Sequence, residues 1–406
     1  MQHELIVVGV GPGAADQMTP AAAEAVRRAG CAVAAPRHLP LVAGHANVLT
    51  LGRFSETLDR VAEELERGTV AVLVSGDPGL YSLLPLLKRR FPAAPLRVLP
   101  GVSSLQSLCA AAGETWADAA ILSGHGRPLT ASRLLNAVER GRLTALFCGD
   151  ECSPRWACEA LAGAVGSLGE RVEVVVGERL SYPDQRVTRG SPAELAGRDF
   201  DPLSLVLLRN AEPWTPPFGR PKDEDFVRGR PPMTRAEVRS VVLDRLELTP
   251  DAVLWDVGAG TGSVSVAAAL ACPDGEVHAL ECGPEALELL ERNRERFRLH
   301  NMTIHAGRAL ARLDGLPRPT HAFVGGSGGE LEGLLDRLST FAGCRVLVSA
   351  VTLDTLARSA TILRGPLWHG LEAIQVAVAE SRPLGQGLLM AGSNPVTLLG
   401  AWAGPR

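Results

Sequence analysis

The chain has 406 residues, of which 46% are hydrophobic and 21% are charged, enough for two or three domains with substantial cores. Its formal net charge of −4 gives no electrostatic footprint for nucleic acid or an anionic membrane surface. No apolar stretch reaches the roughly 18 to 20 residues of a membrane span, and no secretory signal is recognisable, so we expect a cytoplasmic protein.

The eight cysteines are scattered along the chain without paired C-x-x-C motifs. This pattern favours buried, reduced thiols over disulfides or a metal site. We therefore expect no metal.

The first predicted element is an apolar strand within residues 4–13, ELIVVGVGPG, which ends in a glycine-rich turn. Thr19 is expected to cap a helix of small residues that has Pro20 in its first turn and reaches about Ala29. The chain thus opens with a strand, a turn and a helix.

This first turn also fits a relaxed dinucleotide fingerprint at Gly9, Gly11 and Ala14, so a nicotinamide or flavin enzyme is an alternative. Pro12 removes a backbone N–H that a pyrophosphate would use. The next apolar stretch, residues 31–35, is not followed by an acid for a ribose. Both observations weigh against that alternative.

Two further strands end in tight turns, TVAVLVSGDPG at residues 69–79 and LRVLPG at 96–101, and a helix follows from about Ser103. Ligands of open parallel sheets bind outside the carboxyl ends of the strands. The turns VGVGPG, SGDPG and PGVSS are expected to meet there. Any one of them could be a plain structural turn, but three together favour a ligand site.

These turns and SGHGRP at residues 123–128 resemble the tetrapyrrole methylases, which are class III S-adenosylmethionine (SAM) methyltransferases. The resemblance implies two small α/β subdomains, about 1–112 and 113–212, with SAM in the cleft between them. SGHGRP is most similar to the member that acts at carbon 5 of a precorrin. By this resemblance the SAM site is lined by Pro12, Ser75, Gly76, Asp77, Ser103 and Ser104. The second subdomain is expected to contain strands near 119–122, 144–148, 172–176 and 204–208.

A linker is predicted next, because residues 211–232 contain six prolines and a charged run. We expect a first domain at 1–212, a stiff linker at 213–232 and a second domain at 233–406. Each domain has its own glycine turn, which indicates a fusion of two unlike domains.

The second domain opens with a predicted helix in which Thr234 is the cap and Glu237 completes a capping box. Arg235 and Arg239 are four residues apart and would share one face. They are either solvated side chains or a clamp for substrate carboxylates. The adjacent linker, which can fold over an active site, favours the clamp.

Residues 254–269, LWDVGAGTGSVSVAAA, predict a strand that passes through a glycine turn into a helix. Gly258, Gly260 and Gly262 let a ligand lie directly against peptide N–H groups. Ser263 stands where a dinucleotide fingerprint needs its last glycine or alanine. The turn therefore suits a ligand without a pyrophosphate.

The next strand, EVHALE at residues 276–281, ends at Glu281, whose carboxylate can accept both hydroxyls of a ribose. Further strands are expected at 303–306, 320–324, 345–349, 372–380 and 395–401. Together they predict a doubly wound, seven-stranded α/β sheet.

The glycine turn and Glu281 resemble motifs of the class I SAM methyltransferases. Four segments, MTRAEVR (233–239), FVGGSGG (323–329), SAVTLDTL (349–356) and SNPV (393–396), narrow the resemblance to the decarboxylating precorrin methyltransferases of cobalamin (vitamin B12) biosynthesis. By this resemblance a second SAM site is formed by Asp256, Gly258, Gly260, Thr261, Gly262 and Glu281.

The loop GGSGG, residues 325–329, stands where nucleobase methylases carry an Asp/Asn-Pro-Pro-Tyr turn, which argues against a nucleic-acid substrate. Its glycines allow a large flat ligand to approach the backbone, and Ser327 is a candidate catalytic residue. Arg308 stands where the class I family usually places the acid that holds the adenine amino group.

Methyl transfer from a sulfonium needs alignment and exclusion of water more than a covalent catalyst. Asp77 and His125 are candidate groups for moving the acceptor's ring proton, and Arg235 and Arg239 would hold carboxylates. The resemblance implies a homo-oligomer that uses two SAM sites to methylate precorrin-6B, a tetrapyrrole, at carbons 5 and 15. It also implies loss of carbon dioxide from the ring C acetate, giving precorrin-8.

Three alternatives stay open. One is a SAM methyltransferase that acts on another tetrapyrrole, and a second is a nicotinamide-dependent oxidoreductase. The third is a SAM-sensing scaffold that binds the ligand without turnover.

Overall fold

The computed structural model describes residues 3–126, 129–216 and 220–404. The chain forms two compact units. The first comprises Met1–Leu129, Gly141–Gly163 and Ser167–Pro213, and the second comprises Thr130–Arg140, Ala164–Gly166 and Trp214–Arg406. No helix within the described ranges is long and apolar enough to cross a membrane. All eight cysteines are free thiols.

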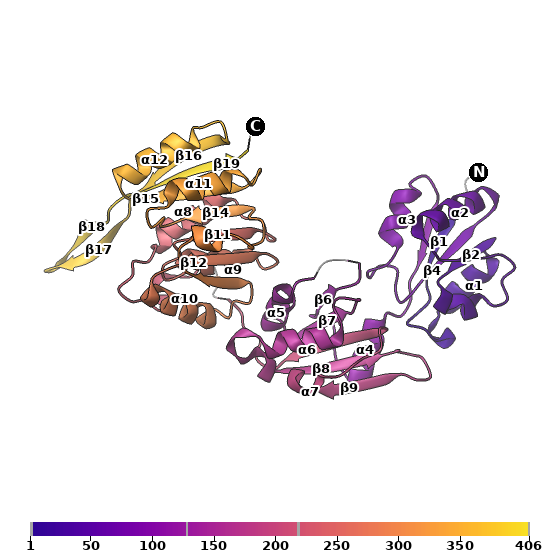
Figure 1. Ribbon diagram of the computed structural model, residues 1–406. Helices are drawn as coiled ribbons and strands as arrows, with labels where there is room; N and C mark the ends of the chain where they lie inside the picture. Colours follow the sequence, from indigo (N-terminus) through magenta and orange to yellow (C-terminus); the bar gives the residue numbers. More distant parts are fainter. Residues whose placement is uncertain (1–2, 127–128, 217–219, 405–406) are drawn as a thin grey trace. The chain divides into compact units, whose positions relative to one another are not determined.

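The first unit begins with a five-stranded parallel sheet of order β3-β2-β4-β1-β5 (Figure 1). Its strands are β1 (Leu5–Gly9), β2 (Cys31–Ala34), β3 (Val48–Thr50), β4 (Val70–Val74) and β5 (Leu96–Leu99). Helix α1 (Pro20–Arg28) packs on one face, and α2 (Phe54–Arg67) and α3 (Leu84–Arg90) pack on the other. The predicted Thr19 cap of α1 is confirmed, because its side chain accepts the N–H of Ala22.

The second sheet of this unit has the order β6-β7-β10-β8-β9, and only β6 and β7 are parallel. Its strands are β6 (Ala120–Ser123), β7 (Leu143–Phe147), β8 (Val172–Glu178), β9 (Arg186–Gly190) and β10 (Ser204–Asn210). The helices beside it are α4 (Ser104–Ala112), α6 (Pro154–Ala162) and α7 (Pro192–Leu195). The four predicted strands are confirmed. The edge strand β9 was missed because its sequence, RVTRG, is polar and largely exposed.

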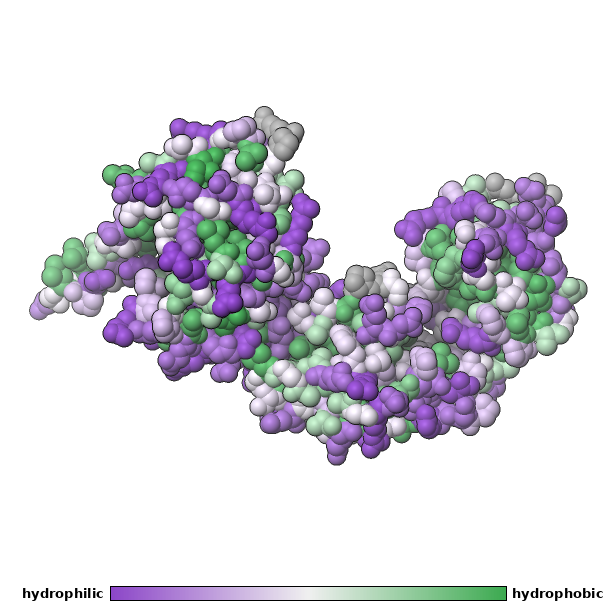
Figure 2. Space-filling model, in the orientation of Figure 1, coloured by the Kyte–Doolittle hydropathy of each residue, from purple (hydrophilic) through white to green (hydrophobic). Residues whose placement is uncertain are grey.

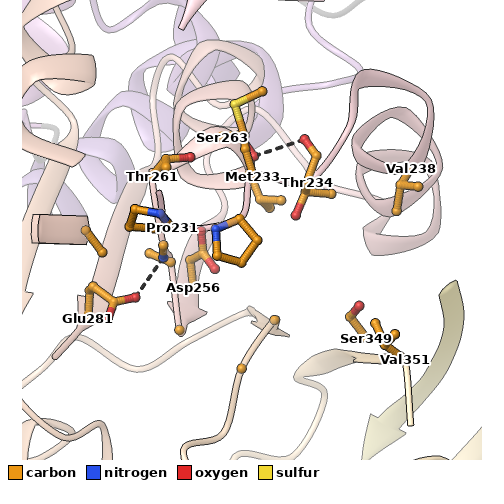
Figure 3. Close-up of a pocket in the computed structure, with 18 of the residues that line it drawn as sticks. Pro231, Met233, Thr234, Val238, Asp256, Thr261, Ser263, Glu281, Ser349 and Val351 are labelled. Carbon is orange, nitrogen blue, oxygen red and sulfur yellow. Dashed lines mark hydrogen bonds between the residues drawn. The ribbon is translucent and has the colours of Figure 1, made fainter. Parts of the chain in front are cut away.

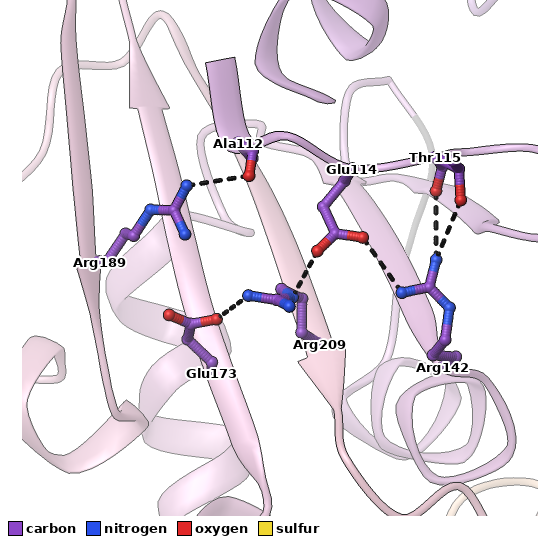
Figure 4. Close-up of polar contacts among 7 residues, drawn as sticks. All are labelled: Ala112, Glu114, Thr115, Arg142, Glu173, Arg189 and Arg209. Carbon is purple, nitrogen blue, oxygen red and sulfur yellow. Dashed lines mark hydrogen bonds and ion pairs between the residues drawn. The ribbon is translucent and has the colours of Figure 1, made fainter. Parts of the chain in front are cut away.

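A carboxylate after α4 fastens that helix to the second sheet (Figure 4). Glu114 forms ion pairs with Arg142 at 3.1 Å and with Arg209 at 2.8 Å. Arg209 also pairs with Glu173, and Arg189 donates to the carbonyl oxygen of Ala112 at 3.0 Å. These contacts fix the end of α4, whose beginning carries two of the predicted site residues.

The second unit contains a seven-stranded sheet of order β13-β12-β11-β14-β15-β19-β16, as the sequence predicted. Its strands are β11 (Val253–Val257), β12 (Glu276–Glu281), β13 (Met302–Ala306), β14 (His321–Val324), β15 (Arg345–Ala350), β16 (Trp368–Val376) and β19 (Val396–Ala403). β19 pairs antiparallel with both β15 and β16, and the other neighbouring strands of this sheet pair in parallel.

Helices cover both faces of this sheet. One core contains side chains of α8 (Ala236–Leu246), α9 (Ser263–Ala271) and α10 (Pro284–Arg296). The other core contains side chains of α11 (Leu331–Ser339) and α12 (Leu353–Leu363). The doubly wound α/β fold is therefore confirmed.

A hairpin of β17 (Ala379–Leu384) and β18 (Gly387–Gly392) extends from this sheet between β16 and β19 (Figure 1). This hairpin was not predicted from the sequence, and the preceding strand was predicted to continue to residue 380. Leu384, Leu388 and Met390 are exposed on the hairpin, and Figure 2 shows hydrophobic residues beside polar ones there.

The helix cap predicted at Thr234 is wrong. Helix α8 starts one residue later, and its N-cap is Arg235, which forms no side-chain capping bond. The carbonyl oxygen of Thr234 instead accepts hydrogen bonds from Arg239 at 2.8 Å and from Ser263 at 3.4 Å.

Candidate functional site

The second glycine turn follows β11 and has the conformation that its sequence predicts. Gly258, Gly260 and Gly262 have φ angles of 71°, 57° and 84°. Residues with a Cβ atom rarely adopt such positive values. A Cβ on Gly258 would overlap the carbonyl oxygen of Gly326, so this turn lies directly against the 325–329 loop.

A cavity of about 810 Å³ lies beside this turn (Figure 3). It is bounded by the glycine turn, the residues after β12, β14 and β15, the segment before α8, and the base of the hairpin. Figure 3 shows Glu281 at one end of the cavity, Ser349 and Val351 at the other, and Asp256 between them. The predicted residues Asp256, Gly258, Gly260, Thr261 and Glu281 all line this cavity.

The Glu281 carboxylate is anchored by backbone groups. One oxygen accepts the N–H of Gly260 at 2.8 Å, and the other accepts those of Cys282 at 2.7 Å and Gly283 at 2.8 Å. These bonds fix the carboxylate at the wall of the cavity, where it can accept hydroxyl groups of a bound ligand.

Asp256 is fully buried, with 0% of its surface exposed. One carboxylate oxygen accepts a hydrogen bond from Ser265, and the other has no partner among the described residues. Burial raises the pKa of Asp256 to about 6, and the charge of Glu281 acts in the same direction. The Thr261 hydroxyl is also buried, and no described residue bonds to it. Two unpaired polar groups in a cavity wall suit a polar ligand or ordered water, and an ammonium group matches the carboxylate.

The segment at residues 226–235, here called the strap, covers part of the cavity. Pro231, Pro232 and Met233 line it. Arg230 bonds to Glu285 through its backbone N–H at 3.1 Å and its side chain at 3.0 Å. The end of the predicted linker therefore packs against the second unit and forms part of the cavity wall.

Arg235 and Arg239 are not brought together as a clamp. Arg235 lines the cavity and pairs with Glu380 of the hairpin at 3.3 Å. Arg239 is only 1% exposed, and it donates to the carbonyl oxygens of Thr234 at 2.8 Å and Pro221 at 2.5 Å.

The surroundings of Arg239 explain its burial. Its guanidinium pairs with Asp223 at 3.2 Å and lies over the Phe226 ring, with its carbon 4.8 Å from the centroid. Burial lowers the pKa of Arg239, and the nearby Asp223 opposes that change. The predicted carboxylate clamp is thus wrong for Arg239, which holds the strap, and only Arg235 is available at the cavity.

The GGSGG loop lines the cavity through Gly325, Gly326 and Gly328, while Ser327 is not part of the lining. The backbone carbonyl of Ser327 accepts the N–H of Glu330 at 2.9 Å. Arg308 supports this loop by pairing with Glu330 at 2.8 Å and donating to the carbonyl oxygen of Gly328 at 3.1 Å.

In the first unit, the three predicted turns meet at the carboxyl ends of β1, β4 and β5. A Cβ on Gly9 would lie 2.7 Å from both the Gly101 nitrogen and the Gly76 oxygen. Gly11 and Gly76 are joined by an isolated antiparallel β-bridge, in which the N–H of Gly76 donates to the carbonyl oxygen of Gly11 at 2.8 Å. The expectation that these turns gather at one edge is confirmed.

The polar residues of these turns are mostly bonded within the protein. Asp77 accepts the N–H groups of Gly79 at 2.7 Å and Gly101 at 3.1 Å, so its carboxylate shapes the turns. Ser103 caps α4 and forms a capping box with Gln106. The following residue, Ser104, is the first of α4, and Pro12 lies in the first turn.

His125 is exposed, and its N–H donates to Ser123 at 3.2 Å. No hydrogen bond or ion pair joins His125 to Asp77, although both are described residues. Residues 127–128, which complete the SGHGRP motif, lie outside the described residues.

Arg37 and His38 lie beside Ser75 and were not among the site residues that the sequence predicted. The Arg37 guanidinium donates to the Ser75 hydroxyl at 2.6 Å, and that hydroxyl lies 3.1 Å from Nε2 of His38. His38 is 2% exposed, and its Nδ1 has no hydrogen-bond partner in the part of the chain that the structure describes. Burial, aided by the Arg37 charge, lowers the pKa of His38 to about 4. Their position in the sequence could have indicated a place at the ligand-binding edge, because Arg37 and His38 follow closely after the second strand of a parallel sheet.

Comparison with known proteins adds to this geometry. Residues 4–196 match the family described as Tetrapyrrole (Corrin/Porphyrin) Methylases. Residues 226–402 match the family described as Precorrin methyltransferase domain.

Three relatives illustrate the relationship. A precorrin-6Y C(5,15)-methyltransferase (decarboxylating) of Sinorhizobium sp is 29% identical, covering 98% of this chain and 95% of that protein. A cobalt-precorrin-6B C(15)-methyltransferase (decarboxylating) of Salmonella typhimurium is 38% identical, covering 44% of this chain and 93% of that protein. A cobalt-precorrin-7 C(5)-methyltransferase of the same organism is 33% identical, covering 50% of this chain and 98% of that protein.

The sheet order, the glycine turn and the carboxylate at the end of β12 define a SAM-dependent C-methyltransferase. More specifically, the chain belongs to the precorrin methyltransferases, and it joins a tetrapyrrole methylase domain to a precorrin methyltransferase domain.

Proposed function

We propose that this protein methylates precorrin-6B at carbons 5 and 15 and removes the carboxyl group of the ring C acetate, giving precorrin-8 in cobalamin biosynthesis. The observation that carries the proposal is that the relative named for both methylations aligns with 98% of the chain. Relatives named for one of the two positions each align with about half of it.

We assign the carbon 15 methylation and the decarboxylation to the cavity of the second unit. Bound SAM supplies an electrophilic methyl group there. Asp256 would receive its ammonium group, and Glu281, held in place by backbone N–H groups, would accept its ribose hydroxyls. Gly258 and Gly260 would present backbone to it, and Thr261 would add a hydroxyl, while Gly262, which does not line the cavity, would only shape the turn. Pro231, Pro232 and Met233 of the strap would shield part of the cavity from water.

We assign the carbon 5 methylation to the edge of the first sheet, where a second SAM site would be formed. The proposed lining residues are Pro12, Ser75, Gly76, Asp77, Ser103 and Ser104. The close approach of Gly9, Gly76 and Gly101 supports a ligand that lies against backbone. Exposed His125 is the proposed group for moving the ring proton of the acceptor, while Asp77 would keep the turns in shape.

Arg235 is the proposed group for substrate carboxylates at the second site. Its ion pair with Glu380 of the hairpin supports this role, because the same guanidinium lines the cavity as part of Arg235 and already binds a carboxylate. The glycines of the 325–329 loop leave room for a flat macrocycle to approach the backbone. Ser327 is proposed as a catalytic residue only because it belongs to that loop.

We also propose a homo-oligomer, because exposed apolar side chains on the hairpin favour burial against another surface. The free thiols support a cytoplasmic location. The proposed domain limits are 1–212, 213–232 and 233–406, with the strap acting as part of the second domain.

The test is incubation of the purified full chain with precorrin-6B and SAM, followed by mass spectrometry of the product. The expected product has gained two methyl groups and lost one carbon dioxide. A parallel reaction with a different, fully carboxylated precorrin tests the other-tetrapyrrole alternative. Turnover of that compound with precorrin-6B left unchanged would overturn the proposal.

A further inference from the structure

Three side chains form a small cluster at the edge of the first sheet where the proposed carbon 5 site lies. Arg37 and His38 follow β2, and Ser75 follows β4, the strand that pairs with β2 in parallel. Parallel strands end at one edge of their sheet, and ligands bind outside that edge. We call Arg37, His38 and Ser75 the arginine corner.

Hydrogen bonds hold the Arg37 guanidinium in the arginine corner. Its Nη2 donates to the Ser75 hydroxyl at 2.6 Å, and its Nε donates to Nε2 of His38 at 3.4 Å. The Ser75 hydroxyl also lies 3.1 Å from that same Nε2. Because a guanidinium can only donate, Nε2 is the acceptor and the proton of the neutral ring is on Nδ1. His38 therefore orients Arg37 without adding a second positive charge.

The charge of Arg37 is not neutralised within the protein. No carboxylate in the part of the chain that the structure describes forms an ion pair with it, and its Nη1 donates to no described residue. The acid two residues after Ser75, Asp77, bonds instead to the N–H groups of Gly79 and Gly101. Arg37 is exposed, whereas His38 beneath it is buried. A fixed, exposed guanidinium without an acid is prepared to bind a carboxylate.

The sheet order separates Arg37 from most of the proposed SAM site. The proposed lining residues of that site follow β1, β4 and β5, and β2 lies on the other side of β4 in the order β3-β2-β4-β1-β5. Ser75 alone belongs to both groups. Arg37 thus lies at the margin of the cofactor site, where a larger second ligand would extend. A tetrapyrrole carries several carboxylate side chains, so it meets the requirement for an anion at this margin.

We infer that Arg37 binds a carboxylate side chain of the tetrapyrrole during carbon 5 methylation. This inference rests on the proposed function and deepens it, because it names a substrate-binding residue of the first site. The bound carboxylate takes no part in the methyl transfer. Its interaction with Arg37 is therefore equally strong before and during the reaction, and such an interaction lowers the KM without changing kcat.

The test compares Arg37→Ala with the unmodified full chain. Loss of a charge-assisted pair should raise the KM for the tetrapyrrole in carbon 5 methylation about 10- to 100-fold and leave kcat nearly unchanged. Isotopically labelled SAM and NMR of the product distinguish the methyl group at carbon 5 from that at carbon 15. Arg37→Lys keeps the charge but loses the planar fork, so its KM should lie between the two.

A second measurement separates the two possible sources of the carboxylate, because SAM also carries one. Calorimetric titration of Arg37→Ala with S-adenosylhomocysteine (SAH) should show the same equivalents and affinities as the unmodified chain. Arg27→Ala, an exposed arginine at the end of α1 that pairs with Glu24, is the matched control and should change neither the KM nor the SAH affinity.

An unchanged KM in Arg37→Ala would overturn the inference. A weaker SAH affinity in Arg37→Ala would overturn it as well, because Arg37 would then bind the cofactor. Failure of the proposed function looks different, since the unmodified chain would then transfer no methyl group to precorrin-6B.

Discussion

Asn293 of α10 and Val227 of the strap are joined by two hydrogen bonds. The Asn293 side chain accepts the N–H of Val227 at 2.7 Å and donates to its carbonyl oxygen at 3.0 Å. The same amide donates to the carbonyl oxygen of Thr261 at 2.9 Å. One fully buried side chain thus ties the strap to the glycine turn.

Replacing Asn293 with alanine should therefore weaken both the fold and ligand binding. The change leaves the N–H and carbonyl groups of Val227 and the carbonyl group of Thr261 without their partner, which we expect to cost about 2–4 kcal/mol of unfolding free energy. Urea unfolding of the full chain measures this cost. Asn47→Ala, in the first unit, is the control. A loss below about 0.5 kcal/mol would show that the strap is not held by this residue.

Glu281 should contribute to SAH affinity through its carboxylate. Glu281→Ala removes the proposed ribose acceptor and the three backbone bonds that shape the turn. We expect binding at the second site to weaken at least about tenfold, measured by calorimetry. Glu288→Gln, on the exposed face of α10, should leave the affinity unchanged. Equal affinities of Glu281→Ala and the unmodified chain would remove Glu281 from the site.

The raised pKa of Asp256 predicts a pH dependence of stability. Because the folded pKa of about 6 exceeds the ordinary value near 3.8, the folded protein binds this proton more tightly. Its contribution is fully present below about pH 4 and is lost as pH rises through 6, by up to about 3 kcal/mol. The stability of the unmodified chain relative to Asp256→Asn should fall over that range. A difference that does not vary with pH would contradict the assignment.

Ligand affinity should change in the opposite direction. The Asp256 carboxylate attracts the ammonium group of SAH only when deprotonated, so affinity at the second site should rise as pH increases from 5 to 7. In Asp256→Asn that rise should disappear. Calorimetric titrations at several pH values test this, and an equal rise in both proteins would exclude Asp256 as its source.

The two arginines near the strap should behave differently when replaced. Arg239→Ala leaves buried carbonyl groups and Asp223 without a partner, so we expect a loss of about 3–5 kcal/mol of unfolding free energy. Arg235→Ala should keep the fold but raise the KM for the tetrapyrrole, because Arg235 lines the cavity and is the proposed group for substrate carboxylates. Arg358→Ala, an exposed arginine of α12, is the control for both. A destabilised Arg235→Ala with normal KM would reverse these roles.

The sequence was most informative where local chemistry fixes the backbone. Gly258, Gly260 and Gly262 predicted a turn with positive φ, and the apolar strands around it predicted the seven-stranded sheet. The meeting of the three turns in the first unit followed from the rule that parallel strands end at one edge.

The sequence was least informative where contacts are distant. Nothing local at Val227 indicates its bonds to Asn293, which lies 66 residues away. Arg239 was read as available because helical spacing places it near Arg235, but burial and Phe226 hold it inside. The hairpin was missed because its strands lack a buried face, so no alternating pattern marks them.

The central claim is that one chain contains two unlike sites for the same cofactor, and a calorimetric titration with SAH tests it most directly. The account predicts two equivalents per chain. It also predicts one equivalent for Gly258→Ala, whose Cβ would overlap Gly326, and one for Gly101→Ala, whose Cβ would overlap Gly76. Saturation of the unmodified chain at one equivalent would contradict the account.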